Sequence, residues 1–384
     1  MKIKKCRICK STNLITIGSL GNIALSNFTK RPTGGVAGPL ELMYCKNCTL
    51  FQLAHNPERR TLYENHYWYE SSLNPTIVSD LQSVVTDALS VVEPKPGDMW
   101  LDIGANDGTL LSFVPKPFYK IGIDPATNLI PSLKQHADKT IRDFFDEVTI
   151  SKKAKIITAI AVFYDLPDPN LFTQKLKQTL AKNGVAVIQL MTLSPMIENN
   201  DVGNICHEHI EYYSYKSLVT LFDQNGLEIF KVKTNTMNGG SYRLFIRHKK
   251  KGSIRFSEKK YTVAALKRFF VKVEKNKQDF LRFVKKCKTQ KKKIIAYGAS
   301  TKGNTILQYY GLDTKAVSAV VDINPEKEGR FLVASKIPIV STIPDCDYLW
   351  ILPYAFLDFF VTKEKKFREK GGKFVVCTPK FRIV

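Results

Sequence analysis

The sequence predicts an α/β protein built around a doubly wound parallel sheet, with a small metal-binding unit before it and a second α/β unit after it. Three observations support this prediction: two Cys-x-x-Cys pairs near the N-terminus, a glycine-containing turn at residues 102–108 after an apolar strand, and alternating strand and helix patterns on both sides of a long charged stretch. A chain of 384 residues is long enough for two or three domains.

Residues 1–62 form the predicted metal-binding unit. They contain short strand-like pieces separated by turns, which are too small to build a stable core on their own. Each Cys-x-x-Cys pair places two sulfurs on one tight turn, and two pairs complete a closed tetrahedral shell for a structural zinc ion. Free thiols are the alternative. The 35 residues between the pairs must fold back as strands to bring the ligands together, and these ligands are Cys6, Cys9, Cys45 and Cys48.

Residues 63–248 are expected to form the central domain. An aromatic segment over 63–74 precedes a helix that runs to Val92 and ends before Pro94. Strands then alternate with helices, which indicates a parallel sheet. These strands are expected at 99–103, 120–123, 156–161 and 185–190. A charged helical connector spans 249–292. A second Rossmann-like domain occupies 293–384, with strands at its start and at 319–322, 348–352 and 374–377.

The turn at residues 102–108, which we term the cofactor turn, has small residues that let a ligand approach the backbone, and a helix should begin directly after it. The middle glycine of a dinucleotide fingerprint is replaced by Ala105 and Asn106. Asp124, at the end of the next strand, is placed to bind two ribose hydroxyls. This pattern favours S-adenosylmethionine over NAD, and a turn that binds nothing is the alternative. The predicted cofactor contacts are Asp102, Gly104, Asn106, Asp107, Gly108, Asp124 and, for the adenine ring, Asp143, Phe144 and Phe145.

The densest group of reactive side chains is the run at residues 206–214, which contains two histidines and two carboxylates. His207 and His209 are two residues apart, a spacing that does not place both rings on one face of a helix. A general base whose ring is oriented by a carboxylate is therefore the favoured interpretation. A second metal site and a structural network are the alternatives. His207 and Tyr212 are expected to contact the substrate.

Two further segments are predicted to hold a substrate. The first combines glycines, which leave the backbone exposed, with a guanidinium that suits phosphate or carboxylate. Its residues are Asn238, Gly239, Gly240 and Arg243. The second follows a strand and should open a helix, an arrangement that favours an anion; a tight turn without a ligand is the alternative. Its residues are Ser300, Lys302 and Asn304.

The net charge of +23 attracts phosphates, either of nucleic acid or of a nucleotide-linked metabolite, although lysines on solvated helix faces would give the same sum. No apolar run approaches the about 20 residues that cross a bilayer, and the N-terminus lacks the apolar core of a secretory signal. We therefore expect a cytoplasmic monomer with reduced cysteines that binds neither membrane nor nucleic acid.

Taken in order, these motifs resemble the zinc-containing, S-adenosylmethionine-dependent C-methyltransferases of nucleotide-linked keto-deoxysugars, over almost the entire chain. The motifs are the two Cys-x-x-Cys pairs, Leu-Asp-Ile-Gly-Ala-Asn-Asp-Gly at 101–108, Asp-Phe-Phe at 143–145, Phe-Tyr-Asp-Leu-Pro at 163–167, His-Glu-His-Ile-Glu-Tyr-Tyr-Ser at 207–214, Asn-Gly-Gly-Ser at 238–241 and Tyr-Gly-Ala-Ser-Thr-Lys-Gly-Asn-Thr at 297–305. The resemblance implies a class I, Rossmann-like methyltransferase core between a zinc-binding domain and a C-terminal Rossmann-like domain, with a cleft for the nucleotide sugar among them.

The reaction that the resemblance implies is methyl transfer to a carbon beside a ketone. His209 would remove the proton, Glu208 would fix the tautomer of its ring, and Tyr67 would stabilise the enolate oxygen. The chain carries Cys206 and Asp165 where the family has a tyrosine and a histidine. O-methylation of a sugar hydroxyl is therefore an alternative reaction. An RNA methyltransferase and a non-catalytic sugar-nucleotide scaffold are alternatives from other classes, although the sequence has no aromatic ribonucleoprotein motif.

Overall fold

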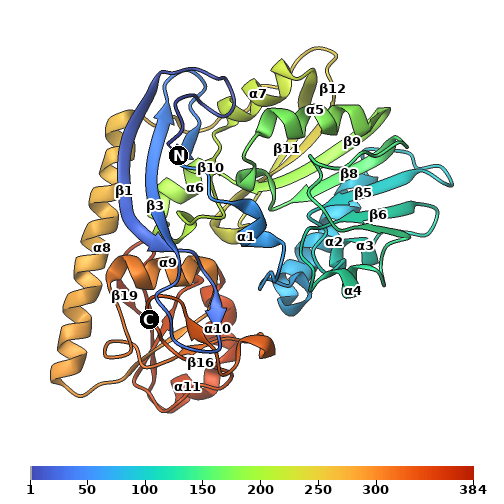
Figure 1. The fold of residues 1–384 in the computed structure, drawn as a ribbon. Coiled ribbons are helices and arrows are strands. Elements are labelled where there is room, and N and C mark those ends of the chain that lie inside the picture. The colour runs from blue at the N-terminus through green and yellow to red at the C-terminus, as the bar shows by residue number, and fades with distance from the viewer. Residues whose placement is uncertain (1) are drawn as a thin grey trace.

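The computed structural model describes residues 2–384, and its central domain contains a seven-stranded sheet (Figure 1). The strand order is β11-β12-β9-β8-β5-β6-β7, in which β12 runs antiparallel to both of its neighbours. The bounds are β5 Met99–Ile103, β6 Tyr119–Ile123, β7 Lys139–Ile141, β8 Ala154–Ile160, β9 Leu180–Met191, β11 Leu227–Asn235 and β12 Ser241–His248. All four strands predicted for this domain are therefore present, and β9 is longer than expected.

The direction in which the chain adds strands reverses between β5 and β8. After β5 the chain adds β6 and β7 on one side, and it then crosses to place β8 and β9 on the other side. In open α/β sheets such a switch point leaves a crevice outside the carboxyl ends of the strands, where ligands bind. The cofactor turn begins in the last two residues of β5 and therefore lies at this crevice.

Helix α2, Pro75–Leu89, covers part of this sheet. The side chain of Asn74 caps it by accepting a hydrogen bond from the backbone N–H of Thr76, and Pro75 occupies the first turn, where no N–H is needed. The helix buries one apolar stripe and ends at Leu89 rather than at Val92. The other helices of the domain are α3 Thr109–Ser112, α4 Ile130–Leu133, α5 Pro169–Thr179, α6 Leu193–Glu198 and α7 Tyr215–Gln224.

The N-terminal unit is built on a long curved hairpin rather than on the short strands that the sequence predicted. Its strands are β1 Leu14–Ala24, β3 Ala37–Cys45 and β4 Phe51–Leu53, and β1 pairs antiparallel with β3. The fourth strand of this sheet is β10, Glu211–Tyr212, which comes from the central part of the chain. Helix α1, Arg59–Tyr63, then leads into the aromatic segment. The sheet thus crosses the boundary predicted after residue 62.

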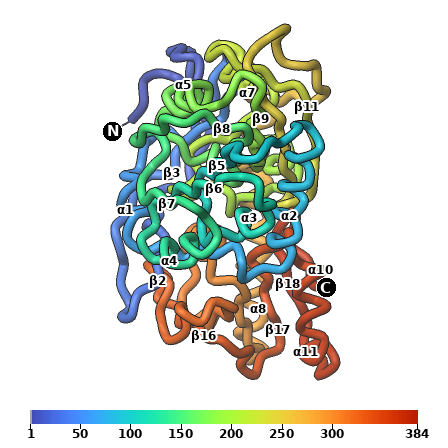
Figure 2. Tube along the Cα trace, turned by 90° about the vertical axis from the view of Figure 1, so that its right-hand side faces the viewer, coloured from blue at the N-terminus to red at the C-terminus, as the bar shows by residue number. Residues whose placement is uncertain are grey.

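The C-terminal unit has a six-stranded sheet in the order β16-β14-β13-β17-β18-β19, parallel except for β19. Its elements are β13 Ile294–Tyr297, α9 Thr301–Tyr310, β14 Val320–Val321, β16 Ile339–Val340, β17 Tyr348–Ile351, α10 Leu357–Lys363, α11 Lys365–Glu369, β18 Lys373–Val376 and β19 Arg382–Ile383. Strand β15, Phe331–Leu332, pairs with β2, Phe28–Thr29, of the N-terminal unit. Figure 2 places this unit at one end of the molecule, beside the central domain.

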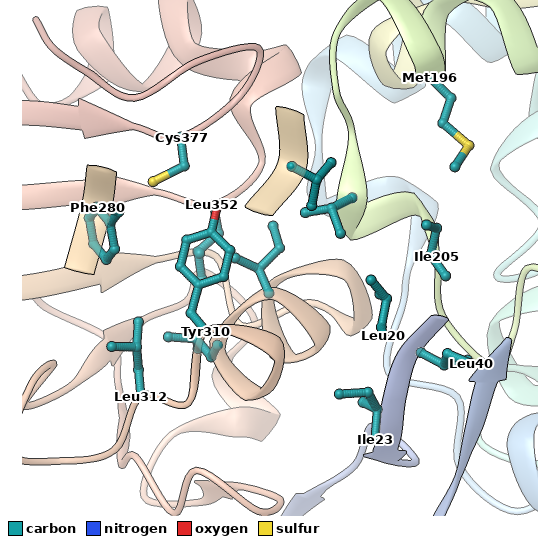
Figure 3. Packing of buried hydrophobic residues seen from close by; sticks show 14 of the residues in the cluster. Leu20, Ile23, Leu40, Met196, Ile205, Phe280, Tyr310, Leu312, Leu352 and Cys377 are labelled. Carbon is teal, nitrogen blue, oxygen red and sulfur yellow. The ribbon is translucent and has the colours of Figure 1, made fainter. Parts of the chain in front are cut away.

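Helix α8, Val263–Thr289, does more than connect two domains. It runs along the outside of β1 and of the C-terminal unit (Figure 1) and buries one face, which includes Phe269 and Phe280. Side chains of β1 and β3, the segment around Ile205, α8 and the C-terminal sheet share one hydrophobic core (Figure 3). The N-terminal and C-terminal units are therefore packed together. Within residues 2–384, none of the helices combines the length and apolarity needed to cross a membrane.

Candidate active site

A cavity of about 470 Å³ lies where the three parts of the chain meet. Its walls come from residues 26–28 of the N-terminal unit, the aromatic segment 63–74, the carboxyl ends of the central strands, and residues 300–302 and 322–324 of the C-terminal unit. Cavities of this size and position hold small ligands and cofactors. It therefore joins the regions that the sequence assigned to cofactor, base and substrate.

The cofactor turn presents backbone to this cavity. Gly104 has a φ of +66°, and a Cβ added there would lie 2.4 Å from Val162 Cγ2, so the position requires glycine. Asp124 lines the cavity and accepts hydrogen bonds from the backbone N–H groups of Asn106, at 2.8 Å, and Ala126, at 2.9 Å. Each oxygen of its carboxylate keeps capacity for a further donor, such as a ribose hydroxyl. These residues fit the predicted cofactor.

Burial raises the pKa of two carboxyl groups at this turn. The pKa of Asp102 rises to about 7 through burial and the nearby charge of Asp124, although Asp102 accepts a hydrogen bond of 2.6 Å from Thr158 Oγ1. The pKa of Asp124 rises to about 6, again because of burial. A cation beside such groups favours their ionised form. The turn is thus suited to a positively charged ligand.

Asp107 and Gly108 form the end of the cofactor turn and do not line the cavity, which corrects the prediction that they contact the cofactor. Asp107 accepts hydrogen bonds from the backbone N–H groups of Thr109, at 3.1 Å, and Ser72, at 2.8 Å. Asn106 does line the cavity, but its side-chain oxygen accepts a hydrogen bond from the backbone N–H of Ser71 at 2.9 Å. The turn therefore holds the end of the aromatic segment in place.

Asp143, Phe144 and Phe145 all line the cavity, as expected for the adenine side. The guanidinium of Arg59 lies 4.0 Å from the centre of the Phe144 ring, and Phe145 packs edge-to-face on Phe172 at 5.0 Å. Phe144 thus carries a cation on one face. The contact of these three residues with an adenine ring stays a prediction, and Arg59 was not among the predicted residues.

His209 lines the cavity, and its ring is held by two neighbours that sequence reasoning missed. Nδ1 lies 2.9 Å from Asn204 Oδ1 and 3.2 Å from the backbone oxygen of Asn204, while the ring of Tyr164 packs at 4.6 Å. Because the backbone oxygen can only accept, Nδ1 carries the proton and Nε2 keeps its lone pair. Burial, assisted by the charge of Lys302, lowers the pKa of His209 to about 3. The ring is therefore neutral at physiological pH.

Glu208 also lines the cavity, but it does not orient His209 as predicted. Its Oε1 accepts a hydrogen bond of 3.0 Å from Thr301 Oγ1 of the C-terminal unit, and Asn204 fixes the tautomer of His209 instead. Burial raises the pKa of Glu208 to about 7. Glu208 is thus a second group able to exchange a proton near neutral pH.

Tyr67 reaches the cavity from the aromatic segment. Its backbone is fixed by Asn128, whose side chain accepts from the N–H of Tyr67 at 2.9 Å and donates to its carbonyl at 3.0 Å. Burial raises the pKa of Tyr67 well above its usual value, so the hydroxyl stays protonated and can donate. Trp68 anchors the same segment to both outer units, since its Nε1 donates to Asn27 and its backbone carbonyl accepts from Asn324.

Three residues predicted to bind substrate are used for structure instead. His207 Nε2 lies 3.2 Å from the backbone oxygen of Gly38. The hydroxyl of Tyr212 donates a hydrogen bond of 2.7 Å to the backbone oxygen of His209. Arg243 is buried between two carboxylates of α2, at 2.8 Å from one and 2.6 Å from the other. None of the three lines the cavity. A buried guanidinium that is already paired has no free donor face for a phosphate.

The remaining predicted substrate contacts divide between the cavity and its support. Asn238, Ser300 and Lys302 line the cavity. Gly239 and Gly240 do not; a Cβ at Gly239 would lie 2.5 Å from the hydroxyl of Tyr354, so they permit close packing. Asn304 is fully buried beneath the site, where its Nδ2 lies 3.3 Å from Ser26 Oγ. Gly239, Gly240 and Asn304 therefore support the wall and do not bind at it.

The four cysteines of the N-terminal unit come together as predicted. The Sγ atoms of Cys6 and Cys48 are 3.5 Å apart, as are those of Cys9 and Cys45, and all four lie within 4.8 Å of one another. Thiolates around tetrahedral zinc stand about 3.8 Å apart for Zn–S bonds of about 2.3 Å. The set fits one zinc ion and leaves no position for a substrate, so the zinc would be structural.

A second group of potential metal ligands lies in the cavity wall, where one ligand atom each from Cys206, Glu208 and His209 fall within 4.8 Å of one another. The ammonium group of Lys302 is close enough to lower the pKa of His209. A positive charge at this position opposes a metal cation. The arrangement therefore favours acid–base chemistry over the second metal site.

Comparisons with known proteins agree with this architecture. Models of three protein families match: a putative zinc binding domain at residues 6–63, a methyltransferase domain at 78–232, and a C-methyltransferase C-terminal domain at 236–379. The C-methyltransferase NovU of Streptomyces niveus is 26% identical over 410 residues, which span 100% of this chain and 97% of that protein.

Solved structures that resemble the chain include a S-adenosylmethionine-dependent methyltransferase from Clostridium acetobutylicum, with a TM-score of 0.38 and 13% identity over 44% of this chain and 92% of that one. Another is the putative methyltransferase in complex with the Haloferax volcanii Trm112 activator, with a TM-score of 0.39 and 12% identity over 46% and 95% of the two chains. The matched domains, in this order along the chain, identify it as a S-adenosylmethionine-dependent methyltransferase with an N-terminal zinc-binding domain, similar over its whole length to a C-methyltransferase.

Proposed function

We propose that this enzyme methylates a carbon next to the ketone of a nucleotide-linked deoxysugar, and that His209 removes the proton from that carbon. One observation carries the proposal: His209, the cofactor turn and Lys302 of the C-terminal unit all line the same cavity. The substrate that we propose has a weakly acidic C–H bond, which requires a base close to the methyl donor. It also carries phosphate charge, which a cation on the opposite unit can bind.

The protein groups support proton removal in a defined way. S-adenosylmethionine, when bound, supplies an electrophilic methyl group. Asn204 keeps the proton of His209 on Nδ1, so Nε2 is free to accept the proton of the substrate carbon. The electron pair of the broken C–H bond moves to the ketone oxygen, where the hydroxyl of Tyr67 can donate a hydrogen bond. The carbon then carries the nucleophilic character needed for methylation.

The start of α9 is suited to bind the nucleotide part of the substrate. Ser300 caps this ten-residue helix by accepting a hydrogen bond from the N–H of Gly303, and Lys302 lies in its first turn. A helix N-terminus and an ammonium group together favour a diphosphate. A sugar hydroxyl as methyl acceptor would use the same base, so O-methylation is the second candidate reaction.

Replacing His209 by alanine tests the proposal. We expect turnover of a nucleotide-linked keto-deoxysugar to fall by about 10²–10⁴-fold, the usual contribution of a general base. S-adenosylmethionine affinity, measured by calorimetry, should change little. Mass spectrometry of products formed in heavy water shows whether the methyl group is on carbon and whether that carbon exchanges its proton. Unchanged turnover in His209→Ala would exclude this base, and a methyl group on oxygen would establish the second candidate.

A further inference from the structure

The zinc-binding sheet is directly joined to the segment that carries His209. Its fourth strand, β10, begins two residues after His209 and pairs with β4, with Glu211 opposite Gln52 and Tyr212 opposite Phe51. The backbone N–H of Leu53 extends this pairing by donating a hydrogen bond of 2.8 Å to the carbonyl of Ile210. The residue immediately after His209 is therefore already bound to the zinc-binding sheet.

Two side chains complete the connection on either side of His209. The hydroxyl of Tyr212 donates a hydrogen bond of 2.7 Å to the backbone oxygen of His209, and its ring packs on Phe51 of β4 at 5.7 Å. On the other side, His207 Nε2 lies 3.2 Å from the backbone oxygen of Gly38 in β3. The backbone of residues 207–212 is thus held by β3 and β4.

The zinc ligands in turn hold β3 and β4. Cys45 is the last residue of β3, and its backbone N–H donates a hydrogen bond of 2.9 Å to the carbonyl of Leu50, next to the start of β4. Thr49, directly after Cys48, contacts Ser214 through their hydroxyls at 2.6 Å. A metal that ties Cys45 and Cys48 to Cys6 and Cys9 therefore fixes the turn from which β4 starts.

We infer that the zinc-binding sheet positions the catalytic base, and that Tyr212 is the positioning residue that transmits this order to His209. The inference rests on the proposed function, in which His209 removes the proton. His209 makes its ring contacts with Asn204 and Tyr164 only while its own backbone stays in place. Fixing the carbonyl of His209 limits the rotation of its peptide, so the imidazole keeps its direction into the cavity.

Tyr212→Phe tests this role, because it removes one hydroxyl and leaves the ring on Phe51. The matched control is Tyr215→Phe, which also removes a buried tyrosine hydroxyl bonded to a backbone carbonyl, that of Ile254 at 2.6 Å, away from the base. We expect Tyr212→Phe to lower kcat by about 10–100-fold, the cost of a misplaced catalytic group. The rate of substrate proton exchange with heavy water should fall in parallel, while S-adenosylmethionine affinity and zinc content stay unchanged. The control should keep its kcat.

Two outcomes would overturn the inference: an unchanged kcat in Tyr212→Phe, or an equal loss in both variants. His209→Ala distinguishes a failure of this inference from a failure of the proposed function. If His209→Ala keeps its activity, His209 is not the base and the proposed function is wrong. If His209→Ala is inactive while Tyr212→Phe is fully active, only the positioning role is wrong. If Tyr212→Phe does not fold, Phe51→Leu examines the same contact from the zinc-binding sheet, with the same expected loss of kcat and of proton exchange.

Discussion

Replacing Asn204 by aspartate would place a charge beside the proposed base with almost no change in size. In the native protein Asn204 Oδ1 lies 2.9 Å from His209 Nδ1, and burial together with Lys302 lowers the pKa of His209 to about 3. A carboxylate at the same place favours the protonated ring. Two opposite charges at about 4 Å interact by about 4 kcal/mol at an effective dielectric constant of 20, which corresponds to a pKa change of about 3 units as an upper value.

We therefore expect the pKa of His209 in Asn204→Asp to rise by about 1–3 units, the range observed for close charge pairs. The assay is an NMR titration of the histidine rings, of which the chain has six, with His209→Gln used to identify the signal. Asn204→Ser, a neutral replacement, should leave the titration near its native position. If the His209 signal in Asn204→Asp titrates as in the native protein, Asn204 does not hold the ring and the tautomer argument is refuted.

Three further changes probe the cofactor turn, a buried carboxyl and the zinc site. Asp124→Asn should weaken S-adenosylmethionine binding by about 10–100-fold in calorimetry, because hydrogen bonds to a charged group contribute about 1.5–3 kcal/mol; equal affinity would mean that Asp124 does not contact the cofactor. Burial raises the pKa of Glu211 to about 8, so the folded state binds its proton more tightly than the unfolded state, and stability is lost as pH rises from about 4.5 towards 8. Glu211→Gln should therefore gain stability relative to the native protein in urea unfolding at pH 9 but not at pH 4; a gain that is independent of pH would contradict this. Cys48→Ser should lower the bound zinc, measured by elemental analysis, well below one equivalent and lower the unfolding temperature, because a closed four-sulfur shell contributes folding free energy; full zinc content would contradict the four-sulfur shell.

The central strands and the zinc ligands could be predicted from the sequence because their signals are local. The strand at 99–103 is apolar except for Asp102 and leads into a small-residue turn, and each cysteine pair lies within four residues. The partners of His209 could not be predicted in this way. Asn204 belongs to no motif, and Thr301, which binds Glu208, is separated from it by 93 residues and lies in another unit. The contact between Thr301 and Glu208 arises only when the C-terminal unit packs on the central domain.

Arg243 illustrates the opposite error. A guanidinium near two glycines suggested a phosphate contact, yet residues 241–248 form β12 in the interior of the central sheet, and the side chain points to α2. Its Nε also donates a hydrogen bond of 2.8 Å to Gln189 Oε1, and Gln189 and Asp80 both line the cavity. The sequence could not reveal this pairing, because the carboxylates that neutralise Arg243 lie more than 150 residues earlier. Arg243 thus affects the cavity indirectly, because it holds the side chains of Gln189 and Asp80 in the cavity wall.

The cavity lining carries mostly acidic side chains, whereas the whole protein has a positive net charge. This difference bears on where the cofactor and the substrate bind within the cavity. Among residues 2–384, ten acidic side chains line the cavity against three lysines and arginines, Arg59, Lys302 and Lys327, although the net charge of the chain is +23. The positive excess therefore lies outside the cavity, mostly on solvated faces such as that of α8. Carboxylates at the predicted cofactor turn would stabilise a bound sulfonium cation and would lose that interaction when the methyl group is transferred, because the remaining thioether is neutral. In the site that we propose, the acidic lining would thus favour the reactive cofactor over its product, and Lys302, which lowers the pKa of His209, would meet the proposed anionic substrate.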